Sequence, residues 1–151
     1  MHVQLSRAIS VVLAMCATVF VGCGGAEKQL AHEMKVFALG YHQIAQGEGQ
    51  FFADEAGVAK IEWKNRPGPA KLEDMGTAEP GFPELAKRIR EGTFVVIWKA
   101  KLRGSAAENS MFYLGHELEI EKKGGWVLRA DGWPERISAE EFEKLQPIPS
   151  E

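Results

Sequence analysis

The sequence predicts an α+β fold in which a long amino-terminal helix packs on a small antiparallel sheet of three to five strands, with short helices. Two observations support this prediction. Between residues 28 and 46 the apolar residues recur at alternating spacings of four and three, which is the period of an amphipathic helix with one buried face. After residue 93 the apolar residues alternate with polar ones, which is the period of β-strands.

The helix over 28–46 is predicted to bury one stripe of side chains: Leu30, Met34, Phe37, Tyr41 and Ile44. Gly47 and Gly49 are expected to end it. Residues 50–68 are predicted to be mainly loop, with a short strand at 60–63. Two short helices are expected at 69–75 and 83–91, each with a proline in its first turn and a glycine after it.

Residues 93–102 and 111–121 are predicted to be strands. The first is expected to be buried on both faces at its start. Strict alternation in the second places one set of side chains on one face (Phe112, Leu114, His116, Leu118 and Ile120) and a row of carboxylates on the other (Glu117, Glu119 and Glu121). Residues 104–110 are predicted to be a polar loop and 122–125 a turn.

The pair Asp131 and Gly132 lies between two apolar runs, 126–130 and 133–137, and predicts a hairpin with a type I′ turn. Closure by two residues would place Trp126 opposite Ile137. Because Pro134 has no N–H to donate, the second strand is expected at the edge of the sheet.

Ser138 and Glu141 have the spacing of a capping box, which predicts a short helix through Leu145. Pro147 and Pro149 are expected to stop this helix and leave residues 147–151 as a frayed tail. One globular domain is therefore predicted over residues 29–146.

Residues 1–22 are predicted to be a lipoprotein signal peptide. Arg7 precedes an apolar run of 14 residues, which matches a signal h-region of about 7–15 residues and is shorter than the roughly 20 needed to span a bilayer. The run ends in Phe20-Val21-Gly22-Cys23, which resembles the bacterial lipobox. Cleavage is expected after Gly22 and lipid attachment at Cys23, with residues 23–28 as a tether.

Two alternatives to this reading remain, namely ordinary cleavage near Gly22 without a lipid and an uncleaved anchor. Cys16 lies inside the signal, so Cys23 is the only cysteine of the mature chain and no internal disulfide can form. Removal of Arg7 leaves 17 basic and 21 acidic residues, a net charge of −4. Charges of both signs are interspersed, which argues against a nucleic-acid partner.

No catalytic residue, metal site or cofactor is assigned, because no nucleophile elbow or phosphate-binding glycine loop is present. His116 is interpreted as a hydrogen-bonded sheet histidine, with a ligand or proton carrier as the alternative. His32 and His42 are ten residues apart, about 15 Å along a helix, and cannot share a metal. Asp131 lacks the oxygen-rich neighbours that calcium requires.

Four tryptophans, Trp63, Trp98, Trp126 and Trp133, either pack in the core or stack on sugars where they are exposed. Core packing is the preferred interpretation, since three of them fall on predicted sheet faces.

Two stretches, "MKVFALGYHQ" (34–43) and "GGWVLRADGWPERISAEEF" (124–142), resemble the prepilin-like H-X9-DG proteins, and "GPAKLEDM" (68–75) resembles lipoprotein members of that group. The matched pieces cover about a third of the mature chain. The resemblance implies a helix packed on a small antiparallel sheet and no defined activity. A lipobox replaces the prepilin peptidase site, and 14 residues rather than nine separate His116 from Asp131, so pilus assembly is not implied.

The sequence therefore predicts a lipid-anchored lipoprotein of the cell envelope, outside the cytoplasm on the periplasmic or outer-membrane side. Its expected role is a non-catalytic interaction or structural module, with an envelope protein or the cell wall as partner. The alternatives are a glycan or small-ligand binding domain that uses exposed tryptophans, and an unrecognised hydrolase.

Overall fold

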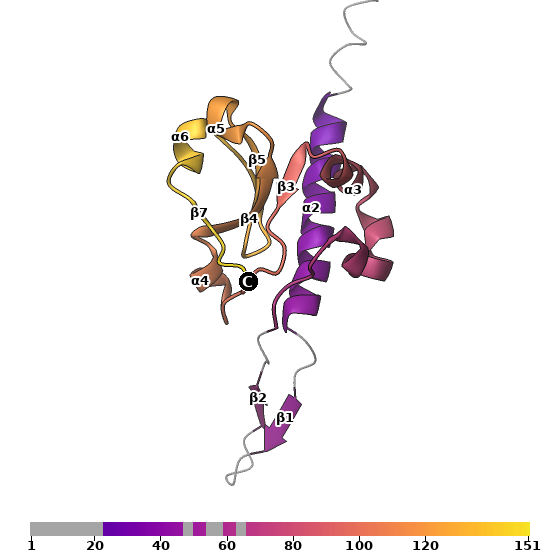
Figure 1. Ribbon diagram of the computed structural model, residues 1–151, viewed down its shortest axis with the longest axis vertical. Coiled ribbons are helices and arrows are strands. Elements are labelled where there is room, and N and C mark those ends of the chain that lie inside the picture. Colours follow the sequence, from indigo (N-terminus) through magenta and orange to yellow (C-terminus); the bar gives the residue numbers. More distant parts are fainter. Residues whose placement is uncertain (1–22, 47–49, 54–58, 63–65) are drawn as a thin grey trace, which may run out of the picture.

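The computed structural model describes residues 23–46, 50–53, 59–62 and 66–151. The described chain has the predicted α+β fold, in which the long helix α2 (Cys23–Gln46) contacts a five-stranded sheet and a group of short helices (Figure 1). The predicted signal peptide, including Gly22, and Trp63 lie outside the described residues.

Helix α2 begins at Cys23, so residues 23–28, which the sequence predicts as a tether, are helical and belong to its first turns. The predicted stripe is confirmed. Met34, Phe37 and Tyr41 are fully buried, together with Leu30, and Ile44 packs against the same core. The spacing of apolar residues in the sequence therefore correctly predicts which face of α2 packs in the core.

Two short helices pack against α2 (Figure 1). The predicted helix at 69–75 is instead a 3₁₀ helix, η1 (Leu72–Gly81), interrupted at Gly76, whose φ of 52° is left-handed. The next helix, α3 (Pro83–Arg90), is where the sequence predicts it. Phe82, between the two, is buried with its ring edge-on to Phe37 at 5.3 Å.

The sheet consists of β3 (Phe94–Val96), β4 (Phe112–Glu117), β5 (Gly125–Arg129) and β6 (Pro134–Ile137), antiparallel in that order, and β7 (Gln146–Pro147), which runs parallel to β4. Strand β6 is an edge, as Pro134 predicts. A separate hairpin, β1 (Gln50–Ala53) and β2 (Ala59–Glu62), occurs where mainly loop was predicted, and lies beyond the carboxyl end of α2 (Figure 1).

The strand predicted over 93–102 ends at Val96, followed by a turn in which Lys99 has a φ of 54°. The Tyr41 hydroxyl stabilises this turn: it donates to the Ile97 carbonyl at 2.8 Å and accepts from the Ala100 N–H at 2.9 Å. Val95 is 37% exposed, so the prediction that both faces are buried here is also wrong.

The strand predicted over 111–121 ends at Glu117, and Glu119 and Glu121 instead lie in the turn and the short helix α5 (Ile120–Lys123) that follow. The register with β5 shifts between Tyr113 and Gly115. An extra residue at such a β-bulge reverses the alternation of side chains after it. His116 therefore lies beside Tyr113 rather than with Leu114, and Glu117 lies on the α3 side.

Another short helix, α4 (Ala106–Asn109), replaces the predicted polar loop. Its amino end is capped by the Ser105 hydroxyl, which accepts from the Glu108 N–H at 3.3 Å.

The β5–β6 turn is not type I′, because only Gly132 (φ 91°) and not Asp131 has a positive φ. Gly132 N donates to Arg129 O, and Arg129 N donates to Trp133 O, which makes a three-residue loop. Trp126 therefore pairs with Arg136 rather than with Ile137. The Asp131 carboxylate accepts from Trp133 N, which favours this longer turn.

The predicted capping box is present at α6 (Ala139–Phe142): the Ser138 hydroxyl accepts from Glu141 N and the Glu141 carboxylate accepts from Ser138 N. Hydrogen bonds from the Ser138 backbone and hydroxyl lower the pKa of Glu141.

The predicted frayed tail at 147–151 is wrong. Ile148 is 2% exposed and its N–H donates to Tyr113 O. Pro147 pairs with Tyr113 in β7, and the Pro149 carbonyl accepts from Lys101 N.

Candidate functional site

A pocket of about 140 Å³ lies near the amino end of α2, where four other elements meet it. It is smaller than the roughly 300–1,000 Å³ of pockets for drug-sized ligands and has room for about five water molecules at ~30 Å³ each. The site therefore suits a ligand of a few atoms. Its lining residues are Ala26, Glu27 and Leu30 of α2, Arg88 of α3, Glu117 of β4, Trp126 of β5 and Arg136 of β6.

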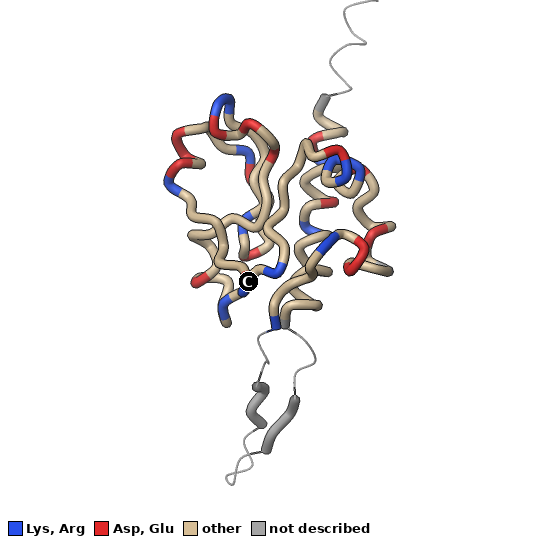
Figure 2. The backbone as a smooth tube through the Cα atoms, in the orientation of Figure 1, with Lys and Arg blue, Asp and Glu red and all other residues tan. Residues whose placement is uncertain are grey.

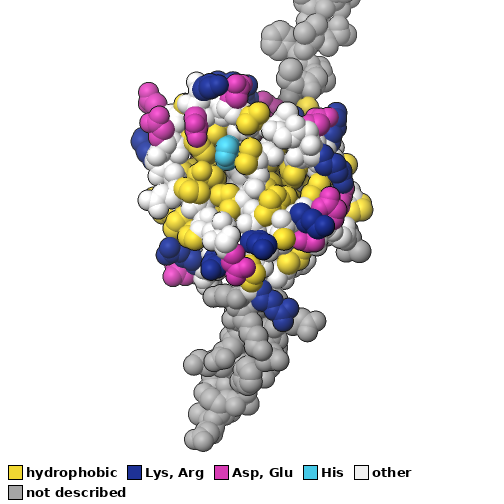
Figure 3. Space-filling view, viewed as in Figure 1, with side chains coloured by type: hydrophobic (Ala, Val, Ile, Leu, Met, Phe, Trp, Pro, Cys, Tyr) yellow, Lys and Arg dark blue, Asp and Glu magenta, His cyan; other side chains and the backbone are white. Residues whose placement is uncertain are grey.

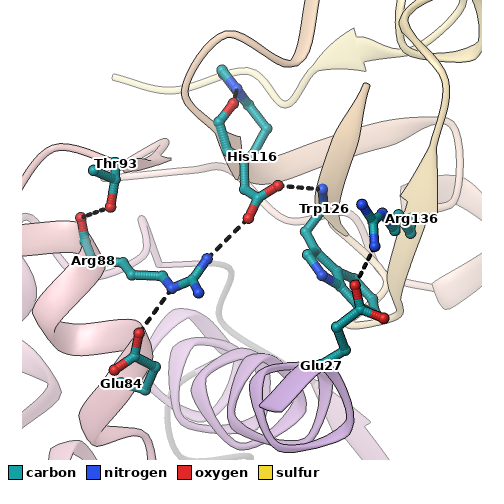
Figure 4. A network of polar contacts seen from close by, with 8 residues as sticks. Glu27, Glu84, Arg88, Thr93, His116, Trp126 and Arg136 are labelled. Atoms are coloured by element: carbon teal, nitrogen blue, oxygen red, sulfur yellow. Dashed lines mark hydrogen bonds and ion pairs between the residues drawn. The ribbon is translucent and has the colours of Figure 1, made fainter. Parts of the chain in front are cut away.

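Arg88 is held in the pocket by two carboxylates (Figure 4). Its Nε lies 3.1 Å from Glu84 Oε1, one turn earlier on α3, and its Nη1 lies 2.9 Å from Glu117 Oε1. The other Glu117 oxygen accepts from the Trp126 N–H at 3.0 Å. The Arg88 and Glu117 side chains are only 33% and 24% exposed, so their charge-assisted hydrogen bond is partly shielded from solvent.

The opposite side of the pocket is an ion pair between Arg136 on β6 and Glu27 on α2 (Figure 4). Both side chains are more than half exposed, at 61% and 51%. Exposed pairs contribute about 0–1 kcal/mol and exchange easily with solvent or with another charged group. This pair can therefore open to admit a ligand at little cost.

Several polar atoms of the pocket have no hydrogen-bond partner among the described residues. They are Nη2 of Arg88, Nε and Nη2 of Arg136, and Oε2 of Glu27. Ala26, Leu30 and the half-buried Trp126 provide the apolar wall beside them. The pocket thus offers cationic donors, one anionic acceptor and a small apolar surface.

His116 is not part of this pocket. Its ring packs against Tyr113 at 5.4 Å and Phe142 at 5.0 Å between centroids, on the other face of the sheet. Nδ1 lies 2.9 Å from the Glu117 carbonyl oxygen, so Nδ1 carries the proton and donates. This geometry is that of a hydrogen-bonded sheet histidine.

His42 is also tied to the backbone, because its Nε2 donates to the Ala130 carbonyl at 2.8 Å. Burial lowers the pKa of His42, while the bond to Ala130 and the nearby Asp131 carboxylate act in the opposite direction. His32 is exposed on α2. No group of three or more His, Cys, Asp or Glu in the described part of the chain is arranged to hold a metal ion.

The three described tryptophans have different surroundings. Trp98 packs against Phe37 and Tyr41 in the core, and Trp126 lines the pocket. Trp133 is 60% exposed, contrary to the preference for core packing, and the Lys35 ammonium lies 4.1 Å from its ring centroid. This cation–π contact occupies one face of the ring that a sugar would use.

Sequence reasoning missed the pocket. Its four charged residues are far apart in the chain, and strict alternation places Glu117 in a row with Glu119 and Glu121 because the β-bulge before it leaves no sequence signal. The buried Glu33, which accepts from Leu85 N at 2.9 Å, was missed as well. The one sequence indication that Glu33 is buried is its position beside the apolar stripe of α2.

Comparison with known proteins gives no relative: no family model, curated protein or solved structure matches the chain. Among the helices that the structure describes, none is both long and apolar enough to cross a membrane.

Proposed function

We propose that the protein is a lipid-anchored lipoprotein of the cell envelope, held outside the cytoplasm through Cys23, and that its domain is a non-catalytic interaction module. The observation that carries this proposal is the sequence Phe20-Val21-Gly22-Cys23 at the end of an apolar run of signal-peptide length. A diacylglycerol on the thiol and a fatty acid on the new amino terminus would together hold the protein firmly in a bilayer.

The fold is compatible with such an anchor. Helix α2 starts at Cys23 and has 24 residues, about 36 Å at ~1.5 Å per residue. Its amino end and the β1–β2 hairpin lie at opposite ends of the molecule (Figure 1). A lipid on Cys23 would therefore place the hairpin on the side away from the membrane.

The surface supports contact with a partner in the envelope, either a protein or the cell wall. On the face shown in Figure 3, hydrophobic side chains gather toward the middle and charged ones toward the rim. This distribution is typical of protein contact surfaces. The resemblance to prepilin-like H-X9-DG proteins belongs to the same proposal and adds no activity to it.

The test is metabolic labelling with palmitate of cells that produce the full chain. We expect the label to be incorporated and the protein to stay in the membrane fraction after a high-salt wash. Cys23→Ser should remain an unprocessed, unlabelled precursor, because lipid attachment requires the sulfur. Cys16→Ser is the matched control and should be labelled normally. Label on Cys23→Ser, or an unlabelled wild-type chain, would refute the anchor.

A second candidate function, small-ligand binding, is favoured by the pocket between α2, α3 and the sheet, which includes Trp126. Glycan stacking is less well supported, since Lys35 already covers one face of Trp133. No observation favours the hydrolase alternative.

A further inference from the structure

We infer that the pocket lined by Arg88, Glu117, Trp126, Arg136 and Glu27 binds the head group of a small α-amino acid, in which a carboxylate and an ammonium are attached to the same carbon. This inference deepens the small-ligand role proposed above. It does not depend on the lipid at Cys23.

The guanidinium groups of Arg88 and Arg136 can donate hydrogen bonds to the carboxylate of the ligand. Arg88 uses Nε and Nη1 for Glu84 and Glu117, which fixes the guanidinium plane and leaves Nη2 without a partner among the described residues. Arg136 uses only Nη1, for Glu27. Because guanidinium N–H groups form charge-assisted hydrogen bonds to carboxylates, the remaining donors of these two arginines provide the anionic subsite.

The ammonium of the ligand has an acceptor and an aromatic neighbour. Only Oε1 of Glu27 is bonded to Arg136, so Oε2 can accept from the ammonium. Both oxygens of Glu117 already accept one hydrogen bond, from Arg88 and from Trp126 N, so Glu27 offers the freer carboxylate. The Trp126 side chain lies beside Glu27 in Figure 4, and an indole attracts a cation near it.

The balance of charge selects a zwitterion over either single ion. The pocket lining contains two arginines and two glutamates, and Glu84, which pairs with Arg88, adds a third carboxylate beside it. A simple anion would be attracted by the arginines and repelled by Glu27 and Glu117. A simple cation would be attracted by the glutamates and repelled by the arginines. A ligand with both charges satisfies both sets of groups.

The size of the pocket selects a small amino acid. About 140 Å³ accommodates alanine, and an aromatic side chain would have to extend out of the pocket into solvent. Ala26 and Leu30 provide apolar contact for the methyl group. The ligand can be the free amino acid or the zwitterionic end of a larger envelope molecule.

The test uses the full chain in detergent micelles and equilibrium dialysis with radiolabelled alanine. Two competitors each remove one charge: N-acetylalanine has no ammonium, and alaninamide has no carboxylate. We expect saturable alanine binding with a dissociation constant on the order of 1 mM or tighter, and binding of each competitor at least about tenfold weaker.

Two substitutions of exposed residues assign the subsites without endangering the fold. Glu27→Gln should abolish the preference for alanine over N-acetylalanine, and Arg136→Gln should abolish the preference over alaninamide. Lys87→Gln is the control: Lys87 is on α3 as Arg88 is, but pairs with Glu91 outside the pocket, and its loss should change nothing. Cys23→Ser should bind alanine normally, which separates this test from that of the lipid.

Three results would overturn the inference. They are no saturable binding up to about 10 mM alanine, equal binding of alanine and both competitors by the wild-type chain, and wild-type preferences in both Glu27→Gln and Arg136→Gln.

Discussion

At the scale of single residues, Tyr41 joins the long helix to the turn after β3. Its hydroxyl is the partner of two backbone groups, Ile97 O and Ala100 N, and its ring packs on Phe37 and Trp98. Burial raises the pKa of Tyr41 to about 12, an effect that the hydrogen bond from Ala100 reduces. The folded protein therefore favours the neutral phenol.

This raised pKa predicts a loss of stability at alkaline pH. The unfolded chain loses the Tyr41 proton near pH 10 and the folded chain only near pH 12, so the contribution is complete below pH 10 and disappears between pH 10 and 12. Tyr41→Phe should reduce the free energy of unfolding by about 1–3 kcal/mol at pH 7, since the Ala100 N–H loses its acceptor.

Urea unfolding at pH 7, 10 and 12 measures both effects. The alkaline loss should be smaller in Tyr41→Phe than in the wild type. An identical loss in the two proteins would show that another group causes it.

Glu33 connects α2 to the start of α3. It is 2% exposed, and its carboxylate accepts from Leu85 N at 2.9 Å and from the Gln29 amide at 3.0 Å. Its negative charge lies at the amino end of α3, where the helix dipole favours it.

We predict that Glu33→Ala costs about 1–3 kcal/mol because Leu85 N then lacks an acceptor. Glu33→Gln keeps an acceptor oxygen and should cost less. Glu73→Ala, an exposed control on η1, should change stability by no more than ~0.5 kcal/mol. Thermal and urea unfolding of the three variants provide the comparison, and equal effects of Glu33→Ala and Glu73→Ala would disprove the capping role.

At the scale of elements, the β5–β6 turn depends on the conformation of Gly132. Its φ of 91° is unfavourable for any other L-residue, while the nearest atom to an added Cβ, on Ala38, would be at a normal 3.5 Å. Gly132→Ala should therefore cost about 1–2 kcal/mol through the backbone alone.

The matched control for this prediction is Gly104→Ala. Gly104 has no positive φ and no atom closer than 3.9 Å to an added Cβ, so its replacement should lie within ~0.5 kcal/mol of the wild type. If urea unfolding gives equal stabilities for both variants, the turn does not require a left-handed residue.

The carboxyl-terminal segment is an integral part of the sheet. Because Ile148 is buried in the core that α2 also joins, Ile148→Ala should cost about 2–5 kcal/mol. The exposed Ser150 pairs only through its backbone, so Ser150→Ala should have no effect beyond ~0.5 kcal/mol. A similar urea midpoint for Ile148→Ala and the wild type would mean that the tail is frayed after all.

Elements with a local signal could be predicted from the sequence. Residues close together in the sequence determine the period of α2, the start of α3 at Pro83 and the capping box at Ser138. Features that depend on distant partners could not be predicted. The turn after Val96 depends on Tyr41, and β7 depends on the start of β4, which β3 leaves unpaired. The pocket could not be predicted for two reasons. Its residues come from distant parts of the chain, and the β-bulge that directs Glu117 toward Arg88 has no local sequence signal.

At the scale of the whole molecule, one core unites α2, the short helices and the inner face of the sheet, and a smaller one forms under α5 and α6. Lysines and arginines alternate with acidic residues over the described chain (Figure 2). The chain that the proposed cleavage would leave has a net charge of −4, and its described part mixes charges of both signs, so the domain has little electrostatic attraction to an anionic membrane. In the proposed function, stable attachment therefore comes from the lipid.

The amino terminus of the protein extracted from membranes tests this claim most directly. Mass spectrometry of the amino-terminal peptide should show a chain that begins at Cys23, with a diacylglycerol on the sulfur and a fatty acid on the amino group. An unmodified terminus at another residue, such as Ala26, or an intact Met1 would contradict it.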